Sequence, residues 1–542
     1  MFQSFNRDLV RLTNTLTQFC VFWGIVSIAD VRANPQKPNI DPQQIPDSIV
    51  LKRFEVINNR VIPDADLNAL LKPYLFRPIG FIELLEVQQA ITQLLVERGY
   101  ITSGAYISPQ TIEDRTVKIE IIEGRIEEIK IYGLKHLRSE YIRSRIETVT
   151  NPPLNRAKLL NILQLLQLNP RIDNISAELS QGINPGESLL EIEIEEANTF
   201  STRLTFDNYQ AVSVGSQSRE LVLADRNVLG FGDRLEVDYI NTPSSNSLAG
   251  LSYTLPLGAR DNEFQVVYGY SNSSITSEPF QDLDLSSRSS YIETSYRHPV
   301  ARSPKQEIAL GFSFSHQNSQ LFLMDVGFPT LARGTDVEGV TKISALRITQ
   351  EYNTRSDRHV FAVNSQFSIG VDAFEATINS GETPDSQFFV WRGQAQYLQQ
   401  LGESTNFLLR GDIQLADRPL VALEQFRAGG ASSVRGYRRD RSLGDNGLFL
   451  STELRQRIWQ TVDGNFSLEL NPFFDFGRVW NNDDLTIENN TLASLGLGLQ
   501  LFLNDTFNAR IDWGLPLIAD KGFQSNSLQD NGLYFSLQLQ PF

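Results

Sequence analysis

The chain has little of the residues on which metal and cofactor sites are built. Its 542 residues include one cysteine, Cys20, and four histidines, which lie far apart at His136, His298, His316 and His359. No spacing among them suits a metal ion, so a hydrogen-bonded or solvated imidazole explains each better than a ligand. We expect no metal and no cofactor.

The motifs of common enzyme sites are also missing. No Gly-x-Ser-x-Gly segment is present, and no glycine-rich loop runs into the Lys-Ser/Thr of a phosphate site. Paired carboxylates such as Glu195-Glu196 and Asp483-Asp484 are explained by solvation. The sequence therefore predicts neither an enzyme nor a nucleotide site.

Positive charge is the minority charge. The chain has 48 Lys and Arg against 64 Asp and Glu, a formal net charge of -16. We therefore do not expect the chain to bind nucleic acid through bulk positive charge. Acidic loops in contact with water are the simpler explanation of the negative net charge.

Long apolar runs are lacking after the first residues. Residues 1–33 are typical of a signal peptide, with Arg7 and Arg11 before an apolar stretch from Phe19 to Ala29. An uncleaved interfacial helix is the alternative. Cleavage would remove Cys20, which suits an oxidising compartment. Past residue 33 no apolar run of about 18 residues occurs, so a membrane-spanning mature chain must be a closed barrel.

A proline-rich segment follows the predicted signal peptide. Residues 34–48 contain Pro35, Pro38, Pro42 and Pro46, which favour extended backbone and remove amide donors. We interpret this segment as a linker, and docking as an extended peptide is the alternative.

Two copies of a small α+β module come next. Residues 49–124 show a strand, two helices and two strands, and residues 125–197 repeat this order. The second helix of the first copy places its apolar residues on one face: Leu84, Val87, Ile91, Leu94 and Leu95. The repeat predicts two βααββ domains, although the period alone fits other small α+β repeats.

From residue 198 to residue 542 the pattern changes to strands of about ten residues that alternate apolar and polar side chains. We count sixteen, with short connections alternating with long ones. That asymmetry is typical of an antiparallel transmembrane β-barrel with tight turns at one rim. A soluble β-sandwich or propeller also alternates and is the competing fold.

The phase of the thirteenth strand directs one carboxylate inward. Counting by twos places Asp475 with Ser467, Glu469 and Asn471 on the lumen side, whereas Phe474 and Phe476 face lipid. An arginine on a glycine-rich loop inside such a barrel can pair with a carboxylate and hold the loop there. Arg435, in the long connection at 418–446, is such an arginine.

Two motifs resemble a known family. The first is Gln425 to Gly430 followed by Ser433-Val434-Arg435-Gly436-Tyr437, and the second is Asn471 to Trp480 around Asp475. With two preceding modules and a sixteen-strand barrel, they resemble the two-partner secretion transporters of the hemolysin/hemagglutinin secretion type, within the outer-membrane assembly factor superfamily. The resemblance implies that the modules are polypeptide-transport-associated (POTRA) domains and that residues 418–446 are loop six.

The resemblance also implies a site. The loop-six residues would be Gly429, Gly430, Val434, Arg435, Gly436 and Tyr437, and the wall residues that receive them Phe473, Asp475 and Gly477. Arg435 would pair with Asp475 in a partly hydrated lumen. A charge-assisted hydrogen bond contributes about 1.5 to 3 kcal/mol to stability, and a fully exposed ion pair contributes about 0 to 1 kcal/mol. We expect the contribution of this contact to lie between the two.

The function implied is export through the outer membrane, with the POTRA domains in the periplasm. The partner would be a secreted client with an N-terminal secretion domain, which binds the POTRA region 49–197. Outer-membrane lipid and the barrel-assembly machinery would be further partners. A barrel-insertion factor of the same superfamily is the first alternative, and a passive porin the second.

Overall fold

The computed structural model of the chain describes residues 48–276, 281–328, 332–381, 383–520 and 527–541. The expected signal peptide, and the expected linker except Ser48, lie outside these residues. The chain divides into two compact units, one ending at Ala197 and the other beginning at Asn198. In the described part of the chain, no helix is long and apolar enough to cross a membrane.

The first module has a three-stranded sheet covered by helices. Its elements are β1 (Ile49–Val50), β2 (Arg53–Ile57), α2 (Asp64–Leu71), the short 3-10 helix η2 (Lys72–Tyr74), β3 (Pro78–Ile79), α3 (Phe81–Glu97), β4 (Gly104–Tyr106) and β5 (Thr116–Ile122). The sheet order is β2-β5-β4, with β2 parallel to β5 and β4 antiparallel to it. The sequence pattern predicted one strand before the first helix of this module. Instead β1 pairs with β3, and Leu51 between β1 and β2 is fully buried.

Helix α3 buries the stripe that its spacing predicts. Val87, Ile91 and Leu95 are fully buried, and Leu84 and Leu94 pack partly buried against the same core. The Glu83 side chain accepts a hydrogen bond of 2.9 Å from the Gly80 amide at the start of the helix. The apolar stripe therefore holds α3 on the sheet.

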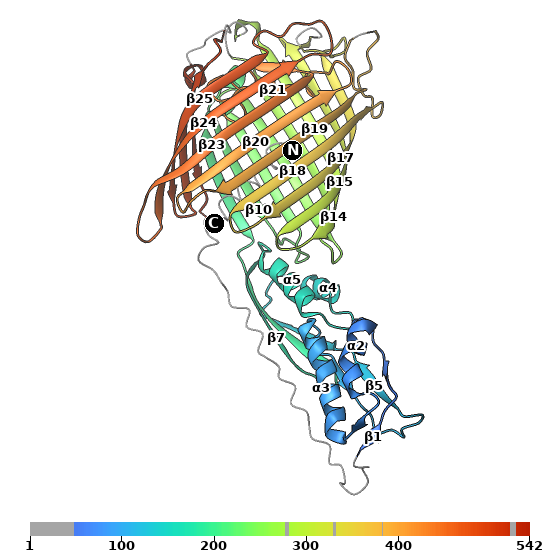
Figure 1. Cartoon of the computed structure of the whole chain (residues 1–542). Coiled ribbons are helices and arrows are strands. Elements are labelled where there is room, and N and C mark those ends of the chain that lie inside the picture. The colour runs from blue at the N-terminus through green and yellow to red at the C-terminus, as the bar shows by residue number, and fades with distance from the viewer. Residues whose placement is uncertain (1–47, 277–280, 329–331, 382, 521–526, 542) are drawn as a thin grey trace. The chain divides into compact units, whose positions relative to one another are not determined.

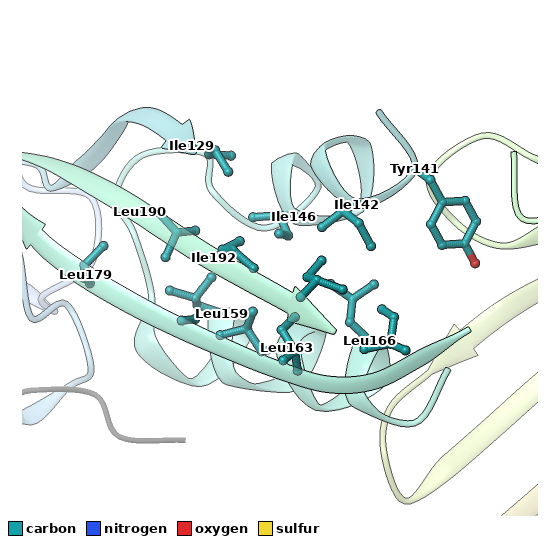
Figure 2. Packing of buried hydrophobic residues seen from close by; sticks show 14 of the residues in the cluster. Ile129, Tyr141, Ile142, Ile146, Leu159, Leu163, Leu166, Leu179, Leu190 and Ile192 are labelled. Atoms are coloured by element: carbon teal, nitrogen blue, oxygen red, sulfur yellow. The ribbon is translucent and has the colours of Figure 1, made fainter. Parts of the chain in front are cut away.

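The second module repeats the plan. It consists of β6 (Arg125–Tyr132), α4 (Ser139–Glu147), α5 (Arg156–Gln167), β7 (Ile172–Gln181) and β8 (Glu187–Glu196), with sheet order β6-β8-β7. Figure 2 shows its core, where Ile142 and Ile146 of α4 and Leu159 of α5 pack beside Ile192 of β8. Asn155 caps α5 by accepting hydrogen bonds from the amides of Ala157 and Lys158.

The second unit is a closed antiparallel barrel. Sixteen long strands form it in the described residues: β9 (Phe200–Asp207), β10 (Ser218–Asp225), β11 (Arg234–Thr242), β12 (Ser245–Leu257), β13 (Asn262–Ser274), β14 (Leu285–Arg302), β15 (Gln306–Leu323), β17 (Val340–Arg355), β18 (His359–Val371), β19 (Phe389–Gln400), β20 (Thr405–Ala416), β23 (Asn446–Gln460), β24 (Phe466–Trp480), β25 (Thr491–Leu503), β26 (Phe507–Pro516) and β27 (Leu533–Leu539). The two-residue β16 (Val326–Gly327) pairs with β15. Each strand pairs with the next along the chain, and β27 pairs with β9 to close the barrel. Figure 1 shows the tilted strands side by side.

The two faces of the wall differ as the alternation predicts. On β25, Leu495, Leu497 and Leu499 are 43–49% exposed on the outer face, whereas Ser494, directly before Leu495, is fully buried on the inner face. On β26, Ile511 and Trp513 are about half exposed, and Asp512 between them is 2% exposed. The prediction of an apolar outer face and a polar lumen is confirmed.

Candidate functional site

Loop six folds back against the inside of the wall. Its strands β21 (Phe426–Ala428) and β22 (Ser442–Gly444) pair antiparallel, so residues 429–441 form the tip of a hairpin. One buried cluster joins the hairpin to strands β23, β24 and β25: Phe426, Ala428, Val434, Tyr437, Phe449, Val479 and Leu492. The hairpin is thus packed on the wall and carries its tip into the barrel.

Arg435 lies directly against Asp475 of β24. Its Nε donates to Asp475 Oδ2 at 2.7 Å and its Nη2 to Oδ1 at 2.9 Å, which is a bidentate geometry. The backbone amide of Arg435 also donates to Oδ2, at 3.1 Å. Ser451 Oγ donates to Oδ1 at 2.6 Å. The carboxylate is thus contacted by the main chain and the side chain of one loop residue.

The hydration expected for this pair is wrong. The side chains of Arg435 and Asp475 are 2% and 0% exposed, because the hairpin itself covers them. Strand phase alone predicted that the carboxylate faces the lumen, but it could not show that the hairpin would bury it there. Removing one partner of a buried ion pair costs about 3 to 5 kcal/mol, more than the value expected for a partly hydrated pair.

A second carboxylate shares the guanidinium. Arg435 Nη1 donates to Glu453 Oε2 of β23 at 2.7 Å and lies 3.5 Å from Asp512 Oδ1 of β26. The ring of Phe473 stacks under the guanidinium, 3.4 Å from its central carbon to the ring centroid. Nothing in the sequence pattern indicated that Glu453 and Asp512 meet the loop. Only the closed wall brings three strands to one cation.

The wall carboxylates differ in their other partners. Glu453 pairs with Arg510 at 2.8 Å and with Arg455 at 2.8 Å, and Asp512 pairs with Arg510 at 2.7 Å. The contacts of Asp475 are with Arg435 and Ser451. If the loop leaves, Glu453 and Asp512 keep a cation, whereas Asp475 loses the guanidinium. Asp475 is therefore the wall carboxylate whose hydrogen-bonded cation comes from the loop.

Glycines on the wall make room for the tip. A Cβ at Gly477 would lie 2.7 Å from a methyl carbon of Val434, and one at Gly514 would lie 2.6 Å from the backbone nitrogen of Gly436. Gly436 itself has a φ of +96°, which a side chain would strain. The wall and the loop are complementary in shape as well as in charge. The match of Gly514 to the loop was not expected from the sequence.

The remaining motif residues build the turn and its contacts. The Gly430 amide donates to the carbonyls of Val434 and Tyr437, at 3.1 and 3.0 Å, and the Gly429 amide donates to Ser433 Oγ at 2.8 Å. The Tyr437 hydroxyl lies 2.9 Å from the carbonyl oxygens of both Ala493 and Ile518. The six candidate residues of loop six and the three candidate residues of the wall thus lie at one interface between the loop and the wall.

The root of loop six has contacts that the sequence pattern missed. Glu424 pairs with Arg347 of β17 at 2.8 Å. Buried Asp445 accepts hydrogen bonds of 2.9 Å from the amides of Leu420 and Asn482. The loop is therefore held near its start and near its end as well as at its tip.

The two α+β modules, residues 49–197, have exposed sheet edges. The orders β2-β5-β4 and β6-β8-β7 leave β2, β4, β6 and β7 as outer strands. Phe76 and Ile82, ahead of and on α3, are 75% and 73% exposed. These surfaces suit the binding of an extended chain. In the described residues, no group of three or more His, Cys, Asp or Glu side chains is placed to hold a metal ion.

Two solved structures have a similar fold. CdiB from Escherichia coli matches with a TM-score of 0.69 and 19% identity, covering 99% of this chain and 98% of that chain. BamA from Haemophilus ducreyi lacking POTRA domains 1-3 matches with a TM-score of 0.54 and 14% identity, covering 91% of this chain and 100% of that chain. These likenesses support a POTRA-barrel fold.

Sequence comparison gives relatives along most of the chain. Heme/hemopexin transporter protein HuxB of Haemophilus influenzae is 24% identical over 475 residues, which are 85% of this chain and 82% of HuxB. Outer membrane transporter CdiB of Dickeya dadantii is 24% identical over 464 residues, which are 82% of this chain and 78% of CdiB.

Family models match both units. The model of the POTRA domain, ShlB-type, matches residues 49–124. The model of the haemolysin secretion/activation protein ShlB/FhaC/HecB matches residues 186–501, more than half of the 542 residues. The chain is an outer-membrane β-barrel transporter with its POTRA region in the periplasm, and it belongs to the haemolysin secretion/activation protein family ShlB/FhaC/HecB.

Proposed function

We propose that loop six is the gate of the pore through which this two-partner secretion transporter exports its partner protein to the cell surface. One observation carries the proposal: Arg435, at the tip of a hairpin inside the barrel, is buried between Asp475 and Glu453 of the wall. A client chain that fills the lumen must displace the hairpin, and with it this cation.

The contacts suit a latch that can be released. The wall keeps Arg510 and Arg455 beside Glu453 when the loop departs, so one carboxylate rather than three loses its cation. Water and the polar client can solvate Asp475 in the open state. A difference of a few kcal/mol between two loop positions is of the size that a bound client can shift.

The POTRA domains would receive the client first. We infer that an unfolded client with an N-terminal secretion domain adds to an outer strand such as β4 or β7, main chain to main chain. Such binding is modest in affinity and tolerant of sequence. Folding of the client outside the cell would drive transport, outer-membrane lipid would surround the apolar face, and the barrel-assembly machinery would insert the barrel.

A disulfide between loop and wall tests the gate. Val434→Cys with Gly477→Cys places two sulfur-bearing residues where a Cβ at 477 would lie 2.7 Å from the Val434 methyl, close enough for a disulfide. We expect the oxidised pair to block export of the partner protein and a reductant to restore it. Each single cysteine variant is the control for the substitution itself.

Undiminished export through the oxidised pair would refute the gate. A client arrested during transport and cross-linked to the barrel separates the alternatives. Cross-links to lumen residues such as Glu469 support export, cross-links between β9 and β27 support a barrel-insertion factor, and no cross-link supports a porin. The family favours the first outcome.

A further inference from the structure

The barrel closes through a short strand pairing. Strands β27 and β9 share four partner pairs, from Ser536 with Asp207 to Leu539 with Leu204. The neighbouring pairings are longer, with eight pairs between β9 and β10 and seven between β26 and β27. Because lipid offers no hydrogen bonds to an unpaired backbone, this seam needs other contacts to stay shut.

One buried side chain prolongs the seam. Asn208, directly after β9, is fully buried. Its Nδ2 donates to the Leu533 carbonyl at 2.9 Å, and its Oδ1 accepts from the Phe535 amide at 2.8 Å. The Asn208 amide also donates to the Phe535 carbonyl at 3.3 Å, so this residue continues the seam past β9 with both its main chain and its side chain.

Gln529 adds a second link across the seam. It lies in the 3-10 helix η5 (Leu528–Asn531), just before β27, and is fully buried. Its Nε2 donates to the carbonyls of Asn208 and Gln210, at 2.5 and 2.8 Å. Its Oε1 accepts from the backbone amide of Arg439, in loop six, at 2.9 Å.

Loop six contacts both sides of this joint. On the β9 side, Arg439 Nη1 donates to the Tyr209 carbonyl at 3.2 Å and to Gln210 Oε1 at 2.6 Å. On the β27 side, Arg438 pairs with Asp530, and the Tyr534 hydroxyl accepts from the Gly436 amide at 3.2 Å. That hydroxyl in turn donates to the Tyr437 carbonyl.

We propose that loop six has a second function, which is to clamp the β9–β27 seam from inside the barrel through Arg438 and Arg439. The two adjacent arginines bind opposite sides of the seam, so the loop bridges strands that share few hydrogen bonds of their own. Displacement of the loop removes both bridges, and the seam loosens in the same step. The clamp is a property of the resting transporter, whereas the gate concerns transport. Either proposal can therefore be refuted while the other remains valid.

Hydrogen exchange of the full chain in nanodiscs, without client, tests the clamp. In Arg438→Ala with Arg439→Ala, we expect the amides of β27 to exchange about tenfold faster or more, the effect of losing charge-assisted hydrogen bonds. Arg418→Ala is the control, because this loop-six arginine pairs with the neighbouring Asp417 just before the loop. Its β27 exchange should equal that of the wild type, as should exchange in β17 and β18 in both variants.

A seam disulfide makes the result specific. Phe206→Cys and Leu537→Cys introduce cysteines at partner positions of β9 and β27. Oxidation should return β27 exchange in the Arg438/Arg439 variant to the wild-type rate. If that variant fails to reach the membrane, the disulfide should restore its insertion. Unchanged β27 exchange, an equal effect of the control, or no rescue by the disulfide would overturn the clamp.

Discussion

At the residue scale, the buried cation of Arg435 is held by carboxylates from three strands. Asp475 contributes both carboxylate oxygens, Glu453 contributes one, and Asp512 Oδ1 lies 3.5 Å from the guanidinium. Asp475 and Glu453 differ in what they keep when Arg435 is removed, since Glu453 retains Arg510 and Arg455. Arg435→Ala removes the contacts of the guanidinium with Glu453 and Asp512 as well, whereas Asp475→Ala leaves those two contacts in place.

We predict that Arg435→Ala and Asp475→Ala each reduce export strongly while the barrel remains inserted. Each leaves a buried charge with fewer partners, at a cost of about 3 to 5 kcal/mol to the loop-in state. Secretion of the partner protein is the measurement, with heat-modifiable gel mobility as the readout of the barrel. Arg427→Ala, on an exposed loop arginine, is the control.

The double variant should be less harmful than the sum of the single variants. We expect a coupling of about 0.5 to 3 kcal/mol between the two residues in the free energy that separates the loop-in state from the loop-out state. Effects that simply add would show that the two residues do not couple. Normal export by Arg435→Ala would count against any role of the latch.

At the scale of elements, loop six and strands β24 to β26 fit because the wall lacks side chains under the tip. Gly477 and Gly514 are partners of this fit, one beneath Val434 and the other beneath Gly436. Close packing of this kind tolerates little added volume.

Gly514→Ala should shift the loop away from the wall. The new methyl would lie 2.6 Å from the Gly436 nitrogen, an overpacking that costs about 1 to 3 kcal/mol. We expect a larger resting conductance in planar bilayers. The control is Gly411→Ala on β20, where the nearest atom lies 3.9 Å from the added Cβ. Equal conductance of the two variants would contradict the fit.

At the scale of the whole molecule, the periplasmic unit has its own electrostatic support. Burial alone would raise the pKa of Glu196, but the amides of Lys135, Leu137 and His136 donate to its carboxylate and lower the pKa below its ordinary value of 4.5. The pKa of Glu187 is also lowered, first by its hydrogen bond from Arg125 and next by Asn184. Both groups stabilise the second module in the charged form.

The sign of the pH dependence follows from these shifts. A carboxylate with a lowered folded pKa contributes stability above its ordinary pKa and loses that contribution as the pH falls through the folded pKa. We predict that Glu196→Gln destabilises the second module near neutral pH and that the difference narrows below about pH 4. Hydrogen exchange of α5 in the full chain measures it. A difference independent of pH would contradict the role of the carboxylate.

The sequence alone determined much of the architecture. The period of 3.6 residues located α3, and alternation along strands such as β25 and β26 placed their apolar residues on the outer face. The barrel strands, the helices and strands of the two small α+β modules and the inward direction of Asp475 follow from these local patterns, because a pattern along one element reports which side of it is buried. That the modules are POTRA domains was implied by the family resemblance.

Only the tertiary structure decided what meets inside the barrel. Glu453, Asp512 and Gly514 come from different strands, and the closure of the sheet brings them to one loop tip. The burial of Arg435 depends on how the hairpin covers it, and the clamp of Arg438 and Arg439 depends on which strands close the barrel. Such contacts join residues far apart in the chain, so no periodicity within one segment can encode them.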